Sequence, residues 1–132
     1  MALIVVAIHF VIVVLHSKAH DTLAVQATPA QLAFIVPVIV VAPVVAALVL
    51  LKFETAGMIL LTASMFGSLI FGVYYHFTVD TIDHVAHVAQ LQPVFWSQMF
   101  RVTAYLLAIS ESFGAAVGIT WLKRPKQSRL LP

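Results

Sequence analysis

The chain has no cysteine among its 132 residues. Without a thiol it cannot form a disulfide, a thiolate metal site or a thiol-based catalytic centre. Charge is also scarce, because lysine, arginine, aspartate and glutamate together make up only 9% of the residues. So few charged side chains cannot cover the exterior of a soluble domain of this length. The exterior that we expect faces lipid.

Hydrophobic residues dominate instead, at 62% of the chain with a mean hydropathy of +1.06. They form long runs, and in lipid a helix is favoured over an unpaired strand because it satisfies its own backbone. We predict an all-α integral membrane protein, an up-down bundle of four transmembrane helices with a short amphipathic interfacial helix between helices 3 and 4. Within one domain of residues 1–132, the predicted segments are helices 2–19, 29–51, 55–77 and 94–122, the interfacial helix 80–91 and a basic tail 123–132.

The second predicted helix has a clear beginning and an unusual interior. Thr28 is a good N-cap, Pro29 fits the first turn, and Gln31 completes a capping-box pattern. Pro37 and Pro43 lie inside the helix. Each removes a backbone donor, so we expect a bend or loosened hydrogen bonding there.

Small residues recur every fourth position in the last two predicted spans, a spacing that lets helices approach closely. The positions are Ala63 and Gly67, Ser68 and Gly72, and Ser110, Gly114 and Gly118. Such stripes fit a neighbouring helix of the same chain or a docked partner. Besides the lipid bilayer, we therefore expect other membrane subunits or a homo-oligomer as partners.

The distribution of basic residues predicts the orientation. Four of the seven lysines and arginines lie in the last ten positions, and basic residues that flank a membrane span mark its cytoplasmic side. This explains the net charge of +2 without nucleic acid as a partner. With four crossings, both termini are expected to be cytoplasmic, in a plasma or inner membrane.

The same topology gathers most of the histidines. Five of the six, with three of the five acidic residues, are expected at the outer membrane surface, in the outer ends of the first and third helices or in the segments that follow them. The candidate metal ligands there are His16, His20, His76, Asp80, Asp83, His84 and His87. A spacing of four residues, as in His16 and His20, places two side chains on one helical face.

Imidazole ligands suit copper, zinc or iron, and added carboxylates favour zinc or iron. A b-type heme, held by His16 or His20 against His76, is a less favoured alternative because most of the histidines lie at the edge of the bundle. Alternatively, these polar residues form only the wet face of a surface helix.

Glu111 is a second candidate site. It lies near the middle of the fourth predicted span, where an ionisable side chain is costly and points to function. His9 on the first span is a candidate partner, and together they suggest an intramembrane proton or ion site.

Three functions remain open from the sequence. The first is a metal-binding or heme-binding site at the outer face, serving metal handling or redox chemistry. The second is a non-catalytic accessory subunit of a larger membrane complex, and the third is a small proton-coupled transporter that uses Glu111. No phosphate-binding loop, nucleophile–base pair or dinucleotide fingerprint is present in the sequence to indicate an enzyme class.

Overall fold

The computed structural model describes residues 1–125, and this part is helical with no strand. The elements are α1 (Ala2–Thr22), α2 (Pro29–Phe34), the π-helical η1 (Ile35–Val41), α3 (Ala42–Leu50), α4 (Glu54–Val73), the π-helical η2 (Tyr74–Thr78), α5 (Val85–Val88) and α6 (Val94–Leu122). They join into four helical stretches that are long and apolar enough to cross a membrane: Ala2–Thr22, Pro29–Leu50, Glu54–Thr78 and Val94–Leu122. The predicted tail, residues 123–132, lies mostly outside the described residues.

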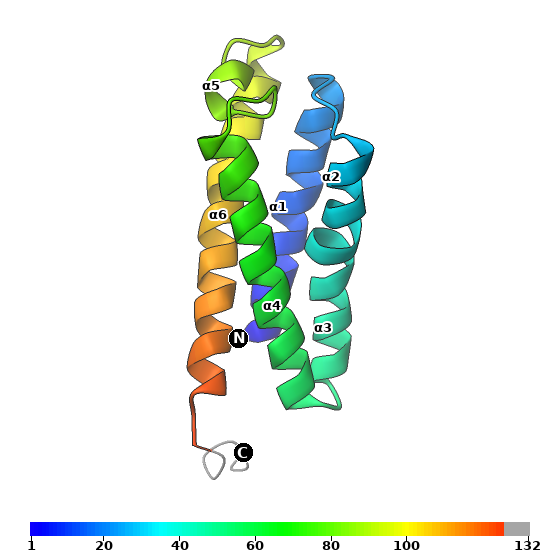
Figure 1. Ribbon diagram of the computed structural model, residues 1–132, viewed down its shortest axis with the longest axis vertical. Coiled ribbons are helices and arrows are strands. Elements are labelled where there is room, and N and C mark those ends of the chain that lie inside the picture. Colours follow the sequence, from blue (N-terminus) through cyan, green and yellow to red (C-terminus); the bar gives the residue numbers. More distant parts are fainter. Residues whose placement is uncertain (126–132) are drawn as a thin grey trace.

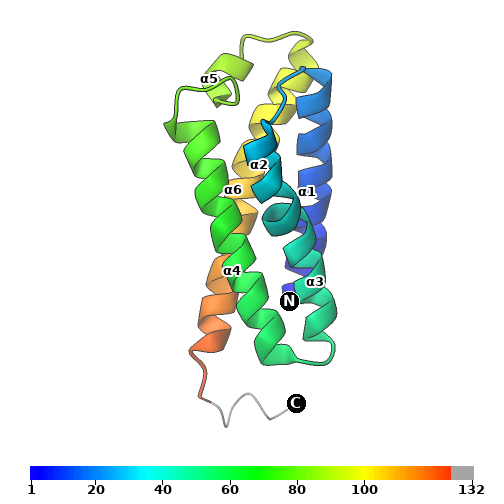
Figure 2. The ribbon, with the colours of Figure 1, turned by 45° about the vertical axis from the view of Figure 1, so that its right-hand side comes forward.

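The four stretches lie side by side, and successive ones are joined at alternating ends (Figures 1 and 2). α6 packs against both α1 and α4, and α3 packs against α4. The N-terminus and the end of α6 lie at one end of the molecule, which we call the terminal end. The connection that contains α5 covers the other end, the capped end (Figure 1).

The helices α1, α4 and α6 each bury one stripe whose residues recur every three or four positions. In α1 the buried residues are Val5, Val6, His9, Ile12, Val13, His16 and Ala19. This spacing is that of a helical face packed against its neighbours. The stripe contains two histidines, whereas the opposite face exposes large apolar side chains such as Ile4 and Val11.

Two apolar clusters close the two ends of the bundle. At the terminal end, the basal cluster consists of Val5, Val6, Ala46, Met58, Leu61, Met65 and Ala115. At the capped end, a second cluster consists of Ala19, Leu23, Val25, Val85, Val88, Phe100 and Ala104. Buried polar side chains, including His9, Ser68, Thr103 and Glu111, lie along the helices between them.

The second stretch behaves as its sequence predicts at the start and shows how the prolines are accommodated. Thr28 Oγ1 accepts from the Gln31 amide at 3.2 Å, and Gln31 Oε1 accepts from the Thr28 amide at 2.7 Å, so the capping box is confirmed. The helix then widens into the π-helical segment η1, which contains Pro37. Since proline has no amide hydrogen, it cannot continue the α-helical ladder, and a local change of helical type absorbs the defect.

The predicted amphipathic helix 80–91 is largely wrong. Only α5, residues Val85–Val88, is helical, because the His84 side chain caps it by accepting from the Ala86 amide at 3.2 Å. The expected faces are also not those observed: Ile82 is exposed, whereas Asp83 is buried. Side-chain contacts to the backbone, such as His87 Nδ1 to the Thr81 carbonyl at 2.8 Å, replace helical hydrogen bonds in this segment.

The end of α1 carries backbone strain that a substitution can relieve. Ala24 has φ of 55°, while the Val25 amide bonds the His20 carbonyl and the Ala24 amide bonds that of Asp21. This is a Schellman arrangement with alanine at the left-handed position that glycine prefers. We expect Ala24→Gly to raise the free energy of unfolding by about 0.5 to 1 kcal/mol, measured by thermal unfolding in detergent. Ala27→Gly, in the same connection, should give no gain, and an equal gain there would contradict the explanation.

Candidate metal centre

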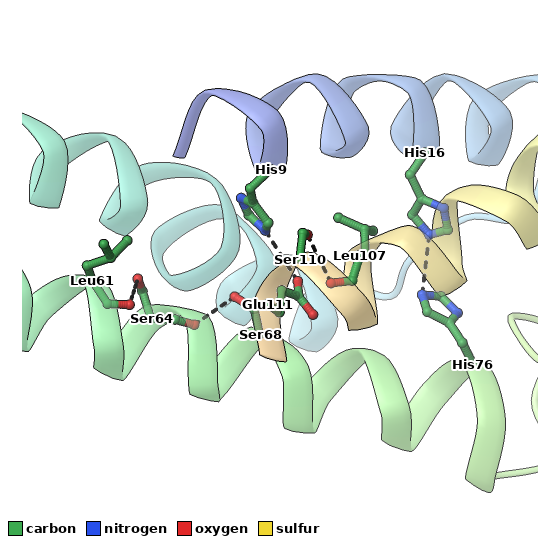
Figure 3. Close-up of polar contacts among 9 residues, drawn as sticks. All are labelled: His9, His16, Leu61, Ser64, Ser68, His76, Leu107, Ser110 and Glu111. Atoms are coloured by element: carbon green, nitrogen blue, oxygen red, sulfur yellow. Dashed lines mark hydrogen bonds and ion pairs between the residues drawn. The ribbon is translucent and has the colours of Figure 1, made fainter. Parts of the chain in front are cut away.

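Three histidines converge at the capped end of the bundle. His16 and His20 lie one turn apart near the end of α1, and His76 lies in η2. One ligand nitrogen from each lies within 4.8 Å of the others. His16 Nε2 and His76 Nε2 face each other across 3.3 Å (Figure 3). We call these three residues the histidine triad, and such a group can hold a metal ion.

The other ring nitrogen of two of the triad histidines is fixed by a backbone carbonyl. His20 Nδ1 lies 2.7 Å from the Val25 carbonyl oxygen, and His76 Nδ1 lies 3.0 Å from that of Asp83. A carbonyl only accepts, so both Nδ1 atoms carry the hydrogen and donate it. In the neutral rings this leaves Nε2 with a free lone pair, as a metal ligand requires.

The third triad histidine, His16, has its Nδ1 atom fixed by the side-chain hydroxyl of Thr103. Its Oγ1 lies 2.9 Å from His16 Nδ1, and 2.7 Å from the carbonyl oxygen of Met99, to which it donates. With its hydrogen directed at that carbonyl, the hydroxyl oxygen accepts from Nδ1 of His16. With these tautomers two Nε2 lone pairs face each other at 3.3 Å, an arrangement that a cation between them would stabilise.

The spacing suits a metal ion. Nitrogen bonds of about 2.0–2.1 Å at tetrahedral angles hold two imidazole nitrogens about 3.3–3.4 Å apart. The 3.3 Å between His16 and His76 matches this value. The third nitrogen lies within 4.8 Å of the others, and an inward side-chain movement of up to about 1.5 Å brings it to the tetrahedral spacing.

A cavity of about 340 Å³ adjoins the triad. All three histidines line it, together with Asp83, Glu111 and apolar residues of α1, the second helical stretch and α6. Asp83 is only 4% exposed, and its Oδ2 accepts from Gln31 Nε2 at 3.2 Å. Its other oxygen, Oδ1, has no hydrogen-bond partner. A buried carboxylate oxygen without a partner is costly, and a cation in the cavity would offset that cost.

The remaining predicted ligands do not join the triad. His87 Nε2 pairs with Asp80 Oδ1 at 3.0 Å, but the two side chains are 50% and 87% exposed. His84 caps α5 through its Nδ1. Their positions match the wet-surface alternative, since exposed groups lose little by remaining hydrated.

The buried glutamate has a partner. Glu111 Oε1 lies 3.3 Å from His9 Nε2, and the two side chains are 3% and 1% exposed (Figure 3). The pair lies on the buried stripes of α6 and α1. Glu111 lines the same cavity as the triad, so the cavity has histidines toward the capped end and a carboxyl group toward the middle of the bundle.

Two supporting residues escape a reading of the sequence alone. Thr103 precedes Glu111 by eight residues on the same buried stripe, with Leu107 between them, and this spacing is the only signal of its position. Gln31 is recognisable as a cap, but nothing in the sequence indicates that its amide reaches Asp83.

No protein family, curated protein or solved structure matches the chain.

Proposed function

We propose that this chain is a small integral membrane protein, an up-down four-helix bundle that binds one transition-metal ion through Nε2 of His16, His20 and His76. One observation carries the proposal. The Nδ1 atoms of the triad are held by Thr103 and by two backbone carbonyls, while the Nε2 atoms of His16 and His76 face each other at 3.3 Å. This outer hydrogen bonding is what fixes histidine ligands around a metal.

The distribution of side chains supports insertion in a membrane. Large apolar residues are exposed along all four long stretches, for example Ile8, Leu48, Ile70 and Ile109. Buried positions include histidine, serine, threonine and glutamate beside the apolar clusters. In a soluble bundle, charged and polar side chains lie mostly at the surface, where water hydrates them. Lipid accepts the apolar exterior, and ionisable residues inside a membrane bundle face its interior.

Charge supports one orientation. Lys52, Lys123 and Arg124 follow helices that end at the terminal end, and such residues favour the cytoplasmic side. Lys18 and Arg101 are the basic residues toward the other end. The terminal end is therefore proposed to be cytoplasmic and the triad to lie at the outer face of a plasma or inner membrane.

The geometry favours a bare ion over heme. Two axial histidines of a heme lie on opposite sides of the macrocycle, about 4 Å apart between nitrogens for bonds of about 2 Å. Here the nitrogens are 3.3 Å apart. The rings of His20 and Phe100 lie 4.8 and 4.6 Å from that of His16, so they occupy space that a macrocycle needs. Zinc and copper suit an all-imidazole set with tetrahedral spacing.

Three protein ligands leave a coordination position open toward the cavity. A closed four-ligand site holds its metal for structure, whereas an open site exchanges ligands. We therefore propose that the protein handles metal, taking up and releasing an ion at the outer face.

The test is metal analysis of protein purified in mild detergent without chelator and then titrated with zinc. We expect about one bound ion per chain, retained in a variant with His84 and His87 both replaced by alanine, since those residues lie outside the triad. If the purified protein holds no metal and titration shows no stoichiometric binding, a shared proton between His16 and His76 explains the contact, and the proposal is wrong.

A further inference from the structure

We propose that the His9–Glu111 pair is a proton-binding position coupled to the triad, so that a metal ion entering the cavity displaces a proton from the pair. This inference rests on the proposed metal site and adds an exchange of cations to it. The cavity is the link, because the triad histidines and Glu111 line it together.

The distance between the two positions is short. A Cβ on Gly72 would lie 3.8 Å from Glu111 Oε2, so the carboxyl group lies beside this residue of α4. Gly72 precedes His76 by four residues, a separation of about 6 Å along a helix. The carboxyl group thus lies about one helical turn from His76 along the helix axis.

The pair holds one exchangeable proton whichever partner carries it. A protonated glutamate beside a neutral imidazole and a glutamate–imidazolium ion pair both have zero net charge, and the proton belongs to the pair. Either form suits side chains that are 1% and 3% exposed, because an uncompensated charge is costly there. Loss of the proton leaves one negative charge.

Binding of a metal ion at the triad favours loss of the proton from the His9–Glu111 pair. A divalent ion on three neutral imidazoles brings two positive charges into a poorly solvated interior. A negative charge on the pair then becomes favourable. When the ion binds the three Nε2 lone pairs, the His9–Glu111 pair loses one proton to water. The net charge of the His9–Glu111 pair then changes from zero to minus one.

Among the described residues, five other titratable side chains line the cavity with Glu111. α1 presents His9 and His16, and η2 presents His76, while α4 presents Ser68 and Gly72 and the second stretch presents Ile35 and Ile39. The other titratable residues that line the cavity are His20, Asp21 and Asp83. No residue of the basal cluster is among those that line it, so the proton has its exit toward the triad.

The experiment counts protons. Zinc is titrated into the detergent-solubilised protein by calorimetry in two buffers of different ionisation enthalpy, which gives the protons released per zinc bound. We expect the wild type to release about one proton more than Glu111→Gln, whose amide cannot ionise. Zinc affinity of this variant should fall by about tenfold or more, because the negative charge is lost. Glu54→Gln, at the terminal end, is the matched control and should leave both values unchanged.

The outcomes separate this inference from the metal site itself. Equal proton release by wild type and Glu111→Gln, with zinc bound by both, overturns the coupling and leaves the metal site standing. Absence of zinc binding by the wild type overturns both. An infrared difference spectrum of the wild type needs no substitution: zinc should remove a carboxylic-acid or imidazolium band, and an unchanged spectrum contradicts the coupling.

Discussion

Replacing His16 with alanine is expected to weaken zinc binding about a hundredfold, since a four-ligand zinc site is stabilised by about 10–16 kcal/mol, or roughly 3 kcal/mol for each ligand. His16 is the central member of the triad. It faces His76 at 3.3 Å, and its ring centroid lies 4.8 Å from that of His20. Without it, two histidines remain as ligands, and they hold the ion less tightly. Competition with a chelator of known zinc affinity measures the change.

A second variant separates loss of a ligand from loss of packing. His16→Gln keeps a polar side chain of similar size that can still bond Thr103, so the fold should be retained while zinc affinity falls as in the alanine variant. His87→Ala removes a half-exposed histidine near the same end and should bind zinc like the wild type. Equal weakening by His87→Ala and His16→Gln would place the ion on the surface segment instead of in the triad.

Four long apolar helices were predictable from composition and hydrophobic runs. The boundaries agree within a few residues because Thr28 and Pro29 mark a helix start and the polar segments mark the breaks. The segment after η2 was not predictable in the same way. Its periodicity suggested a helix, but Asp83 and His84 use side-chain and backbone groups for local contacts, which periodicity does not record.

Part of the candidate site was also predictable from the sequence, and part of it was not. Four crossings place His16, His20 and His76 near one end, because the rise per residue of a helix fixes depth. Depth alone gave no way to choose these three from seven candidates. The choice depends on the chain bending back after η2, so that the Asp83 carbonyl meets His76 Nδ1 at 3.0 Å. The contact between His9 and Glu111 depends on how α1 and α6 pack, which counting residues along each helix does not give.

Thr103→Val is expected to weaken zinc binding by about 10- to 100-fold, the usual effect of removing a group that orients a histidine ligand. The substitution keeps the shape of the side chain and removes the oxygen that lies 2.9 Å from His16 Nδ1. His16 is then free to place its hydrogen on Nε2, where it blocks the metal. Thr103→Ser keeps the hydroxyl and should retain most of the affinity, as measured by the same chelator competition.

The matched control lies on the same helix. Thr120 Oγ1 donates to the Val117 carbonyl at 2.9 Å and is exposed, so Thr120→Val removes a comparable hydroxyl far from the triad. Its zinc affinity should equal that of the wild type. If Thr103→Val also binds like the wild type, Thr103 does not set the tautomer of His16. The inference that the Nε2 lone pairs of His16 and His76 face each other would then be wrong. If only Thr103→Val is weakened and serine restores binding, the hydroxyl positions the ligand, because packing alone distinguishes valine from threonine very little.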